Sequence, residues 1–239
     1  AVMASVGVTE VTVSVRPTVG IISTGNELVE PDRVPAGAQI RNSNGLQLMA
    51  QVARAGAIGK YYGIARDEEK AICSLMKKAL EENDVVLISG GVSFGDFDLV
   101  PAVMRSLGLT IHFDQVAMQP GKPLTFCTGE KKALFGLPGN PVSTLVQFEV
   151  MVRAFINKMV GVTEAATVLQ LPLATDYSRK RAERLSWIPC IITPAGEVMP
   201  VEYHGSAHIS ALTGAWGVIT IPRGQSWIQK GEMVSVRQI

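Results

Sequence analysis

The chain has 239 residues, of which 47% are hydrophobic and 18% charged. At roughly 150 residues per domain this length predicts one or two domains, with enough apolar mass for real cores. The 22 Lys and Arg residues nearly balance the 21 Asp and Glu residues, and the formal net charge is +1. No net field therefore draws the chain to nucleic acid or to an anionic membrane, and neither is expected as a partner.

The length of the apolar runs and the spacing of the cysteines argue against a membrane-spanning protein and against a protein stabilised by disulfides or zinc. No uninterrupted apolar run approaches the ~20 residues that a membrane-spanning helix needs. The three cysteines, Cys73, Cys127 and Cys190, lie far apart, which argues against a disulfide framework and against a closed cysteine-rich zinc site. We therefore expect a cytoplasmic protein, with Cys127 as a small core residue.

Residues 17–163 are predicted to form one domain, in which short β-branched runs alternate with amphipathic stretches. The expected strands cover residues 19–23, 61–65, 84–89, 110–116, 124–127 and 133–137, the last two as a hairpin. Helices are expected to start at the caps Asn44 and Asp67, to cover 99–107, and to run from Pro141 to Met159. This alternation predicts a three-layer α/β domain with a mainly parallel sheet.

The hydrophobic pattern changes to a period of two after Thr163. Short strands punctuated by Pro and Gly are expected at residues 169–174, 187–193, 198–203, 218–221 and 233–239. This pattern predicts that residues 164–239 form a small C-terminal β-barrel or sandwich domain. Residues 1–16 have the character of a linker that enters from a preceding part, so we expect this chain to be a fragment of a longer protein.

Four polar turns follow the predicted strands, and ligands of open α/β sheets bind at the carboxyl ends of the strands. The turns cover residues 23–28, 66–67, 89–98 and 137–143. The third turn combines Gly90 and Gly91 with the carboxylates of Asp96 and Asp98. Glycines expose backbone N–H groups to an anion, and paired carboxylates suit a divalent cation, so this turn suggests phosphate together with Mg²⁺. A tight turn with aspartate caps is the alternative.

Two further segments suggest anion binding. Gly139 precedes a predicted helix whose first turn holds Ser143, although a reverse turn that merely starts a helix explains this equally well. Lys122 lies in a loop that two prolines and a glycine stiffen. A lysine held in this way can clamp an oxyanion as a point charge; a solvated loop lysine is the alternative.

Other patterns are weaker. His204 and His208 are four residues apart, but their surroundings are not helical, so a zinc site is not expected. The basic run 179–181 with Arg184 is expected to be a solvated strand edge rather than a polyanion site. The sequence contains no nucleophile-elbow, P-loop or dinucleotide-binding motif, which disfavours the enzyme classes that depend on them.

Taken together, four motifs resemble the MoeA family, the molybdopterin molybdenumtransferases or molybdenum insertases. They are Ser-Thr-Gly-Asn-Glu-Leu (23–28), Ser-Gly-Gly-Val-Ser-Phe-Gly-Asp-Phe-Asp (89–98), Gln-Pro-Gly-Lys-Pro (119–123) and Leu-Pro-Gly-Asn-Pro-Val-Ser (137–143). Each motif alone is weak, but all four in this order are highly specific. Residues 164–239 also look like the family's C-terminal β domain. The sequence departs from the family at Asn26, where Asp is common, and at Gln119, where many members carry Lys. Members normally begin with two further domains.

The resemblance implies insertion of molybdate into adenylylated molybdopterin (molybdopterin-AMP), giving molybdenum cofactor and AMP with the help of Mg²⁺. By motif, the catalytic positions are Glu27, Asp67, Asp98 and Lys122. The positions around the pterin nucleotide and the oxyanion are Thr24, Gly25, Gly90, Gly91, Ser93, Gly95, Gly139, Asn140, Ser143 and Ser206. Asp96 and Asp98 are assigned to the metal. The implied partners are a second copy of the full-length protein, as a homodimer, and the molybdopterin adenylyltransferase.

Two other functions stay open on the sequence. One is a non-catalytic pterin-binding or scaffold module on the same fold, as in a eukaryotic family member that also anchors receptors. The other is the molybdopterin adenylyltransferase itself. That enzyme resembles the α/β domain alone, so the β domain after Thr163 argues against it.

Overall fold

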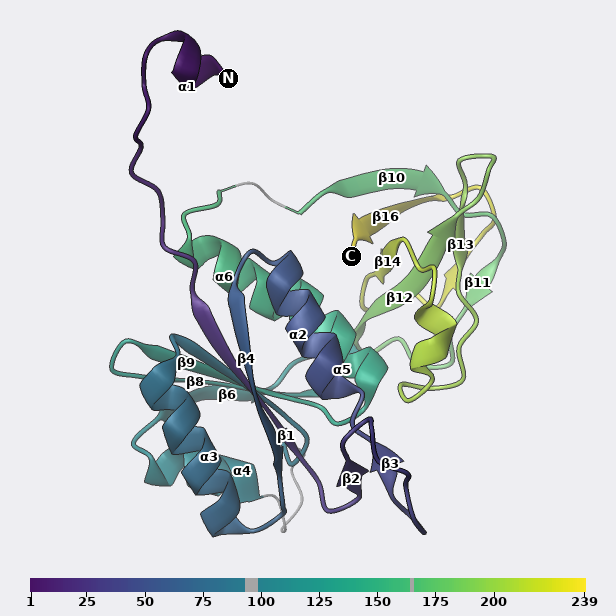
Figure 1. Ribbon diagram of the computed structural model, residues 1–239. Helices are drawn as coiled ribbons and strands as arrows, with labels where there is room; N and C mark the ends of the chain where they lie inside the picture. Colours follow the sequence, from purple (N-terminus) through teal and green to yellow (C-terminus); the bar gives the residue numbers. More distant parts are fainter. Residues whose placement is uncertain (93–98, 164–165) are drawn as a thin grey trace.

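The computed structural model describes residues 1–92, 99–163 and 166–239. They form an α/β part and a smaller β part, and an extended N-terminal segment leads into the first strand (Figure 1). This segment begins with one short helix, α1 (Val2–Ser5). Within the three described ranges, no helix is both long and apolar enough to cross a membrane.

Six strands form the main sheet in the order β4-β1-β5-β9-β8-β6. Their bounds are β1 (Thr18–Thr24), β4 (Ile58–Ala65), β5 (Val85–Ser89), β6 (Thr110–Gln115), β8 (Pro123–Gly129) and β9 (Lys132–Leu137). The strands β4, β1, β5 and β9 pair in parallel, whereas β8 is antiparallel to both of its neighbours. The prediction of a mainly parallel sheet with one hairpin is therefore confirmed.

Helices cover both faces of this sheet (Figure 1). They are α2 (Asn44–Arg54), α3 (Glu69–Glu82), α4 (Leu99–Ser106), α5 (Pro141–Gln147), the π-helical turn η1 (Phe148–Val152) and α6 (Arg153–Met159). Alternate residues of β5 enter opposite cores: Val85 and Leu87 pack with α2, η1 and α6, and Val86 and Ile88 pack with α3 and α4. A strand buried on both faces reads as a continuous apolar run, and the predicted three layers are confirmed.

Three local predictions are wrong. Ser43 rather than Asn44 holds the cap position of α2, and Glu68 rather than Asp67 holds that of α3. The side chains of Asn44 and Asp67 bind distant segments instead. The strand expected over residues 198–203 ends at Pro200, as β13 (Val198–Pro200). The chain then turns back toward the α/β part.

The β part contains a five-stranded sheet in the order β10-β16-β14-β12-β13, in which neighbouring strands are antiparallel. The four strands besides β13 are β10 (Val168–Pro172), β12 (Leu185–Ile192), β14 (Gly217–Ile221) and β16 (Met233–Gln238). Leu173, directly after β10, bridges to Val198 in β13. The sheet therefore curls until its two edges meet, around a core of aliphatic side chains.

Five shorter strands and one 3₁₀ helix complete the described part of the fold. They are β2 (Leu28–Val29), β3 (Ile40–Arg41), β11 (Tyr177–Ser178), β15 (Trp227–Ile228) and η2 (Ile209–Leu212), with β7 (Met118–Gln119) between the two parts. The strand β7 belongs to the α/β part in sequence but pairs with β12. Beside it, Met118 and Val146 pack with Trp187 and Val218 in a shared apolar cluster. This cluster fixes the β part against the carboxyl-end side of the main sheet.

Candidate functional site

A cleft of about 1290 Å³ lies where the parallel strands end and the β part meets them. The predicted site residues that line it are Thr24, Gly25, Glu27, Asp67, Gly90, Gly91, Lys122, Gly139, Asn140, Ser143 and Ser206. They come from turns that lie up to 182 positions apart in the sequence, counted from Thr24 to Ser206. Parallel strands end at the same edge of a sheet, so these turns converge. Ser93, Gly95, Asp96 and Asp98 lie outside the described residues.

Gly90 and Gly91 form the turn that follows β5, and both have positive φ angles, of 96° and 62°. A Cβ atom on Gly90 would lie 2.5 Å from the backbone oxygen of Thr24, and one on Gly91 would lie 3.0 Å from the Thr24 hydroxyl. The turn therefore lies directly against the end of β1. Glycine is required here for its conformation and for its lack of a side chain.

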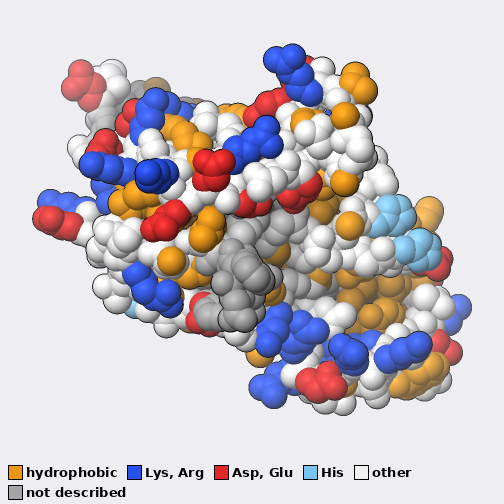
Figure 2. Space-filling view, turned by 90° about the horizontal axis from the view of Figure 1, so that it is seen from below, with side chains coloured by type: hydrophobic (Ala, Val, Ile, Leu, Met, Phe, Trp, Pro, Cys, Tyr) orange, Lys and Arg blue, Asp and Glu red, His pale blue; other side chains and the backbone are white. Residues whose placement is uncertain are grey.

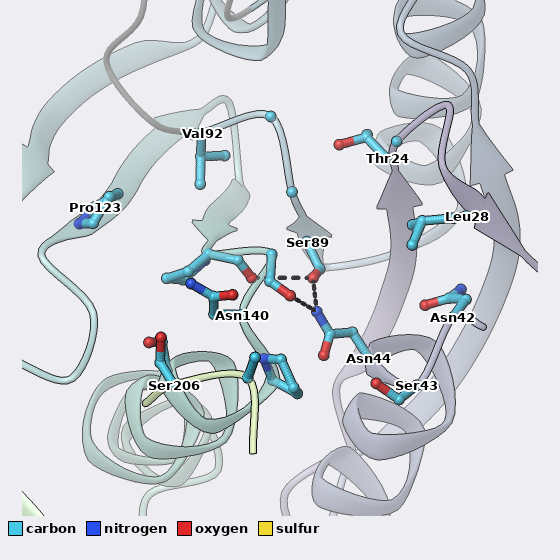
Figure 3. Close-up of a pocket in the computed structure, with 18 of the residues that line it drawn as sticks. Thr24, Leu28, Asn42, Ser43, Asn44, Ser89, Val92, Pro123, Asn140 and Ser206 are labelled. Atoms are coloured by element: carbon cyan, nitrogen blue, oxygen red, sulfur yellow. Dashed lines mark hydrogen bonds between the residues drawn. The ribbon is translucent and has the colours of Figure 1, made fainter. Parts of the chain in front are cut away.

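Asn44 joins two of the converging turns (Figure 3). Its amide nitrogen donates to the Ser89 hydroxyl at 2.6 Å and to the Gly139 carbonyl at 2.9 Å. Ser89 in turn donates to the Pro138 carbonyl at 3.3 Å. The ends of β5 and β9 are thus held to the first turn of α2 by buried hydrogen bonds.

Asn42 occupies a neighbouring position in the cleft wall, and its side chain is satisfied within the protein. Its amide oxygen accepts from the Ser23 hydroxyl and from the Gly45 N–H, and its amide nitrogen donates to the Tyr61 hydroxyl at 2.7 Å. Tyr61 donates to Glu30 at 2.9 Å. Burial, with this acidic neighbour, raises the pKa of Tyr61 well above its usual value. This network ties β1, α2 and β4 together.

Two carboxylates line one side of the cleft. The loop that carries Glu27 is bound to the loop that carries Asp67, because the N–H of Asn26 donates to Asp67 Oδ2 at 3.1 Å and the N–H of Asp67 donates to Asn26 Oδ1 at 3.2 Å. Arg66 adds a bond to the Asn26 carbonyl. The amide at position 26 thus places Asp67 beside Glu27 without adding a third negative charge.

Three cations line the cleft, Arg41, Lys122 and Arg184, and the last two lie where the strand β7 meets the β part. The loop of Lys122 is fastened to α5, because the Gln147 amide donates to the carbonyls of Gly121 at 3.0 Å and Pro123 at 2.8 Å. Arg184 donates to the Met118 carbonyl at 3.3 Å. The loop is therefore as constrained as its prolines suggested, and Lys122 projects from it as an exposed side chain.

The expectation that residues 179–181 and Arg184 form a solvated strand edge is wrong for two of the four residues. Arg184 lines the cleft. Arg179 donates to the carbonyls of Pro222, Gln225 and Arg184, which holds three loop segments together. Lys180 and Arg181 are exposed, as expected. In Figure 2, which views the molecule from the end where β1 and β5 finish, Lys and Arg side chains gather at the lower right.

The two histidines four residues apart are stacked on the surface, with ring centroids 5.8 Å apart and planes 7° apart. A pair of histidine side chains is visible at the right of Figure 2. Among the described residues, no three His, Cys, Asp or Glu side chains are grouped closely enough to hold a metal ion. The pKa of the Cys127 thiol is raised by burial to about 12, as expected for a core cysteine.

Glu27 and Asp67 supply hard oxygen ligands to the described wall of the cleft. Mg²⁺ is commonly bound through one or two carboxylates and completes its shell with substrate phosphates and water. The donor set is therefore compatible with a magnesium ion that arrives with a phosphate-bearing ligand. The predicted metal ligands Asp96 and Asp98 fall outside the described residues.

Sequence reasoning missed several residues of the cleft. Arg41, Asn42, Ser43, Asn44, Ser89 and Arg184 all line it, and none was assigned to the site. The segment Arg-Asn-Ser-Asn (41–44) did carry a signal, since four successive polar residues between a strand and a helix are more than one cap requires. Asn42 and Asn44 are both buried.

The family of the chain follows from its match to family models. Residues 20–158 match the probable molybdopterin binding domain. Residues 170–239 match the MoeA C-terminal region, domain IV. The chain belongs to the MoeA family. The resemblance that the four motifs carry is thereby confirmed.

Curated MoeA relatives carry the same name. Molybdopterin molybdenumtransferase from Staphylococcus epidermidis is 34% identical over 239 residues, which are 99% of this chain and 57% of that protein. The enzyme of that name from Staphylococcus aureus strain N315 is 31% identical with the same coverage. The chain therefore spans little more than half the length of these relatives.

Solved structures agree with the fold. The molybdopterin biosynthesis MoeA protein from Pyrococcus horikosii superposes with a TM-score of 0.86 at 30% identity, over 99% of this chain and 58% of that one. A molybdenum cofactor biosynthesis protein from Pyrococcus furiosus superposes with a TM-score of 0.76 at 24% identity, over 100% and 73% of the two chains. The α/β sheet and the C-terminal β part thus have the arrangement of MoeA.

Proposed function

We propose that this chain is the portion of a molybdenum insertase that holds the pterin nucleotide and molybdate. The reaction is insertion of molybdate into adenylylated molybdopterin, with release of AMP. The observation that carries the proposal is that each of the four motifs contributes residues to the lining of one cleft. Since the chain spans 57% of its relatives' length, the activity is proposed for the longer protein of which this would be a part.

The two walls of the cleft suit the two anionic substrates. Lys122 and Ser143 are proposed to hold molybdate near the dithiolene sulfurs, and Ser206 to complete this contact from the β part. Thr24, Gly90 and Gly91 are proposed to form the surface against which the phosphates lie, where the two glycines add no side chain that would fill the space. Gly25, Ser93, Gly95, Gly139 and Asn140 are proposed to shape the same contact surface.

Mg²⁺ is proposed to bind between the acidic wall and the phosphoanhydride, where it would neutralise charge on the bond that breaks. Glu27 and Asp67 would hold it from the described wall, and Asp96 and Asp98 from the turn after β5. Without a cation, Glu27 and Asp67 would repel a pyrophosphate bound in the cleft, and a bound Mg²⁺ would offset this repulsion. The positive charge of Lys122 stabilises the oxyanion on the opposite wall.

The full-length protein is proposed to act in the cytoplasm as a homodimer that accepts its substrate from the molybdopterin adenylyltransferase. The adenylylated pterin is the product of that enzyme and the substrate of this one. A contact between the two would hand over a reactive anhydride with little exposure to water.

The proposal is tested by incubating the protein with adenylylated molybdopterin, Mg²⁺ and molybdate, and measuring AMP by chromatography. Molybdate-dependent AMP release is expected. Asp67→Asn is expected to lower it about 100-fold or more, and Asp98→Ala to abolish it without unfolding the protein. The matched control is Asp32→Asn, whose carboxylate is exposed and is not among the residues that line the cleft. ATP consumption instead would indicate an adenylyltransferase, and binding without turnover would indicate a pterin-binding module.

A further inference from the structure

Two loops of the β part concentrate positive charge close to the cleft. Residues 179–184 and 222–226 together contain five Lys and Arg residues and one acidic residue, Glu183. These two short loops therefore carry a net charge of +4, whereas the whole chain carries +1. The remainder of the chain is net negative, so the positive charge is a local feature of this surface.

Hydrogen bonds hold the two loops together. The guanidinium group of Arg179 donates to the carbonyl of Pro222 at 2.6 Å and to that of Gln225 at 2.7 Å. The N–H of Gly224 donates to the carbonyl of Ala182 at 2.8 Å. The two loops therefore form one surface, on which the cations keep fixed positions relative to one another.

Three of the cations, Lys180, Arg181 and Arg223, are exposed, and together they are the cationic rim of the cleft. They take part in none of the ion pairs between described residues. Lys and Arg side chains gather in Figure 2 on the side of the molecule that holds the β part in Figure 1. Because no described carboxylate pairs with the cationic rim, its charges act on the surrounding solvent.

The cationic rim lies near the cleft, because Arg184 belongs to the same loop and lines the cleft wall. Arg181 precedes Arg184 by three positions, and three residues span at most ~10 Å of extended chain. The Debye length is also ~10 Å at 0.1 M salt and falls to ~3 Å at 1 M. The field of the cationic rim therefore reaches the cleft wall at moderate salt and is screened at high salt.

We propose that the cationic rim draws anionic ligands to the cleft and raises the rate at which they enter it. The class of ligand rests on the proposed function, in which molybdate and the adenylylated pterin are both anions. Charge of one sign beside a cleft can raise association rates by about 10- to 1000-fold. Arg184 and Lys122 line the cleft and continue the same sign of charge inward. The cationic rim acts before contact, so it should affect association and not dissociation.

The test measures the association and dissociation rates of ADP with a fluorescent label on its ribose, by stopped flow. This probe carries a pyrophosphate and a nucleoside, as the proposed substrate does. The triple variant Lys180→Glu/Arg181→Glu/Arg223→Glu should associate about 10-fold more slowly than the wild type at about 0.1 M salt. Its dissociation rate should be unchanged, and its association rate should equal that of the wild type at about 1 M salt.

Two controls separate the local charge from other effects. The triple variant Lys77→Glu/Lys78→Glu/Lys131→Glu changes the net charge equally, but its residues are exposed and do not line the cleft. Lys77 and Lys78 lie in the half of α3 that leads to β5, and Lys131 directly precedes β9, so all three lie toward the amino ends of the strands. This variant should keep the wild-type association rate. Labelled adenosine, which has no phosphate, should associate equally fast with all three proteins.

A glutamine triple variant of the cationic rim serves if the glutamate variant does not fold, and it should slow ADP by a smaller factor at the same salt. Equal slowing in both glutamate variants, slowing that persists at 1 M salt, or faster dissociation with unchanged association overturns the inference. No binding of labelled ADP, or slower association of labelled adenosine, overturns it as well.

The result is distinguishable from the outcome of the insertase assay. If AMP release fails while the cationic rim still speeds the capture of ADP, the proposed reaction is excluded and the role of the rim in anion capture remains. If AMP release is normal and reversal of the rim charges leaves the association rate unchanged, the reaction stands and the role of the rim is excluded.

Discussion

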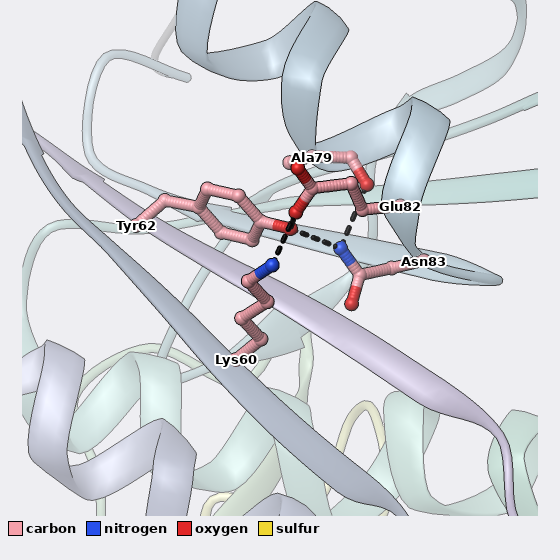
Figure 4. Close-up of polar contacts among 5 residues, drawn as sticks. All are labelled: Lys60, Tyr62, Ala79, Glu82 and Asn83. Atoms are coloured by element: carbon pink, nitrogen blue, oxygen red, sulfur yellow. Dashed lines mark hydrogen bonds and ion pairs between the residues drawn. The ribbon is translucent and has the colours of Figure 1, made fainter.

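The polar side chains at the two ends of the main sheet differ in how fully they are hydrogen-bonded within the protein. At the amino ends of the strands, Thr18 and Asp84 exchange hydrogen bonds at 2.8–3.0 Å, and Lys60, Tyr62, Glu82 and Asn83 bind one another (Figure 4). These groups satisfy each other across strands and helices. At this end of the sheet, these polar side chains are therefore paired with one another.

At the carboxyl ends, some buried polar atoms lack a hydrogen-bond partner among the described residues, although their side chains are held in place. The Thr24 hydroxyl and the Asn44 amide oxygen are buried and have no partner within the described part of the chain. Each such group costs free energy in the ligand-free protein. The two ends therefore differ in how fully these groups are paired, although unpaired buried atoms also occur elsewhere, at Gln51, Thr125, Gln147 and Trp187.

The largest effect on this contrast is expected from Gly90→Ala. The new Cβ would lie 2.5 Å from the Thr24 backbone oxygen, and φ is +96°. Positive φ alone costs about 1–2 kcal/mol, and the contact with the end of β1 adds to this cost. We expect the free energy of unfolding, measured by urea titration, to fall by more than 2 kcal/mol, and AMP release to be lost.

Gly196→Ala is the control for the conformational term. Its φ is +79°, and no atom of the described residues lies within 4 Å of the position that its Cβ would take. This variant is expected to lose only about 1–2 kcal/mol and to keep its activity. Equal losses in the two variants would show that the turn after β5 is not packed against β1 as described.

The next largest effect is expected when the positive charge of Lys122, which lines the cleft, is removed. Lys122→Ala is expected to lower the rate of AMP release about 100- to 1000-fold, the range found when one preorganised oxyanion contact is removed. The side chain is exposed, so the free energy of unfolding should change by less than about 0.5 kcal/mol. Lys78→Ala, on the exposed face of α3, is the control. An unchanged rate of AMP release in Lys122→Ala would show that this lysine does not contact the substrate.

Much of this cleft could be predicted from the sequence because its turns are local features. A β-branched run followed by Gly90 and Gly91 places a glycine turn at a strand end, and prolines around Lys122 constrain that loop, whatever the rest of the chain does. The topology of a parallel sheet then brings the strand ends to one edge. The described members of the predicted site share a cleft for this reason.

The two misplaced helix caps have a common physical cause. Asn44 and Asp67 are residue types that favour cap positions, but their side chains bind groups 41 to 95 positions away in the sequence. The preference of a residue type for helix caps carries no information about partners so far away in the sequence. Arg184 was missed in the same way, because it reaches the cleft only once the β part packs through Met118 and Trp187.

A smaller effect is expected at the closed end of the sheet, from Asp84→Asn. Hydrogen bonds from Thr18 hold the pKa of the Asp84 carboxyl below its usual range. A lowered pKa contributes stability that is present above the ordinary carboxyl pKa and is lost as the pH falls through the folded-state value. Wild type should exceed Asp84→Asn by about 1 kcal/mol at pH 7, as expected for a partly exposed charged hydrogen bond. The stabilities from urea titrations should converge as the pH falls below the ordinary carboxyl pKa and through the lower folded-state pKa of Asp84; a constant difference would exclude the charge as its cause.

The smallest effect is expected from the exposed pair of Lys60 and Glu82. The bonds from Lys60 and Tyr62 lower the pKa of Glu82, and the bond to Glu82 raises the pKa of Lys60. The pair therefore stabilises the fold above the ordinary carboxyl pKa and below the ordinary lysine pKa, and its contribution is lost on either side. Solvent and salt screen exposed charges, so Glu82→Gln should destabilise less than Asp84→Asn at low salt and match the wild type at 1 M salt. A difference that persists at 1 M salt would mean that the hydrogen bond from Tyr62, rather than the charge of Lys60, is what Glu82 contributes.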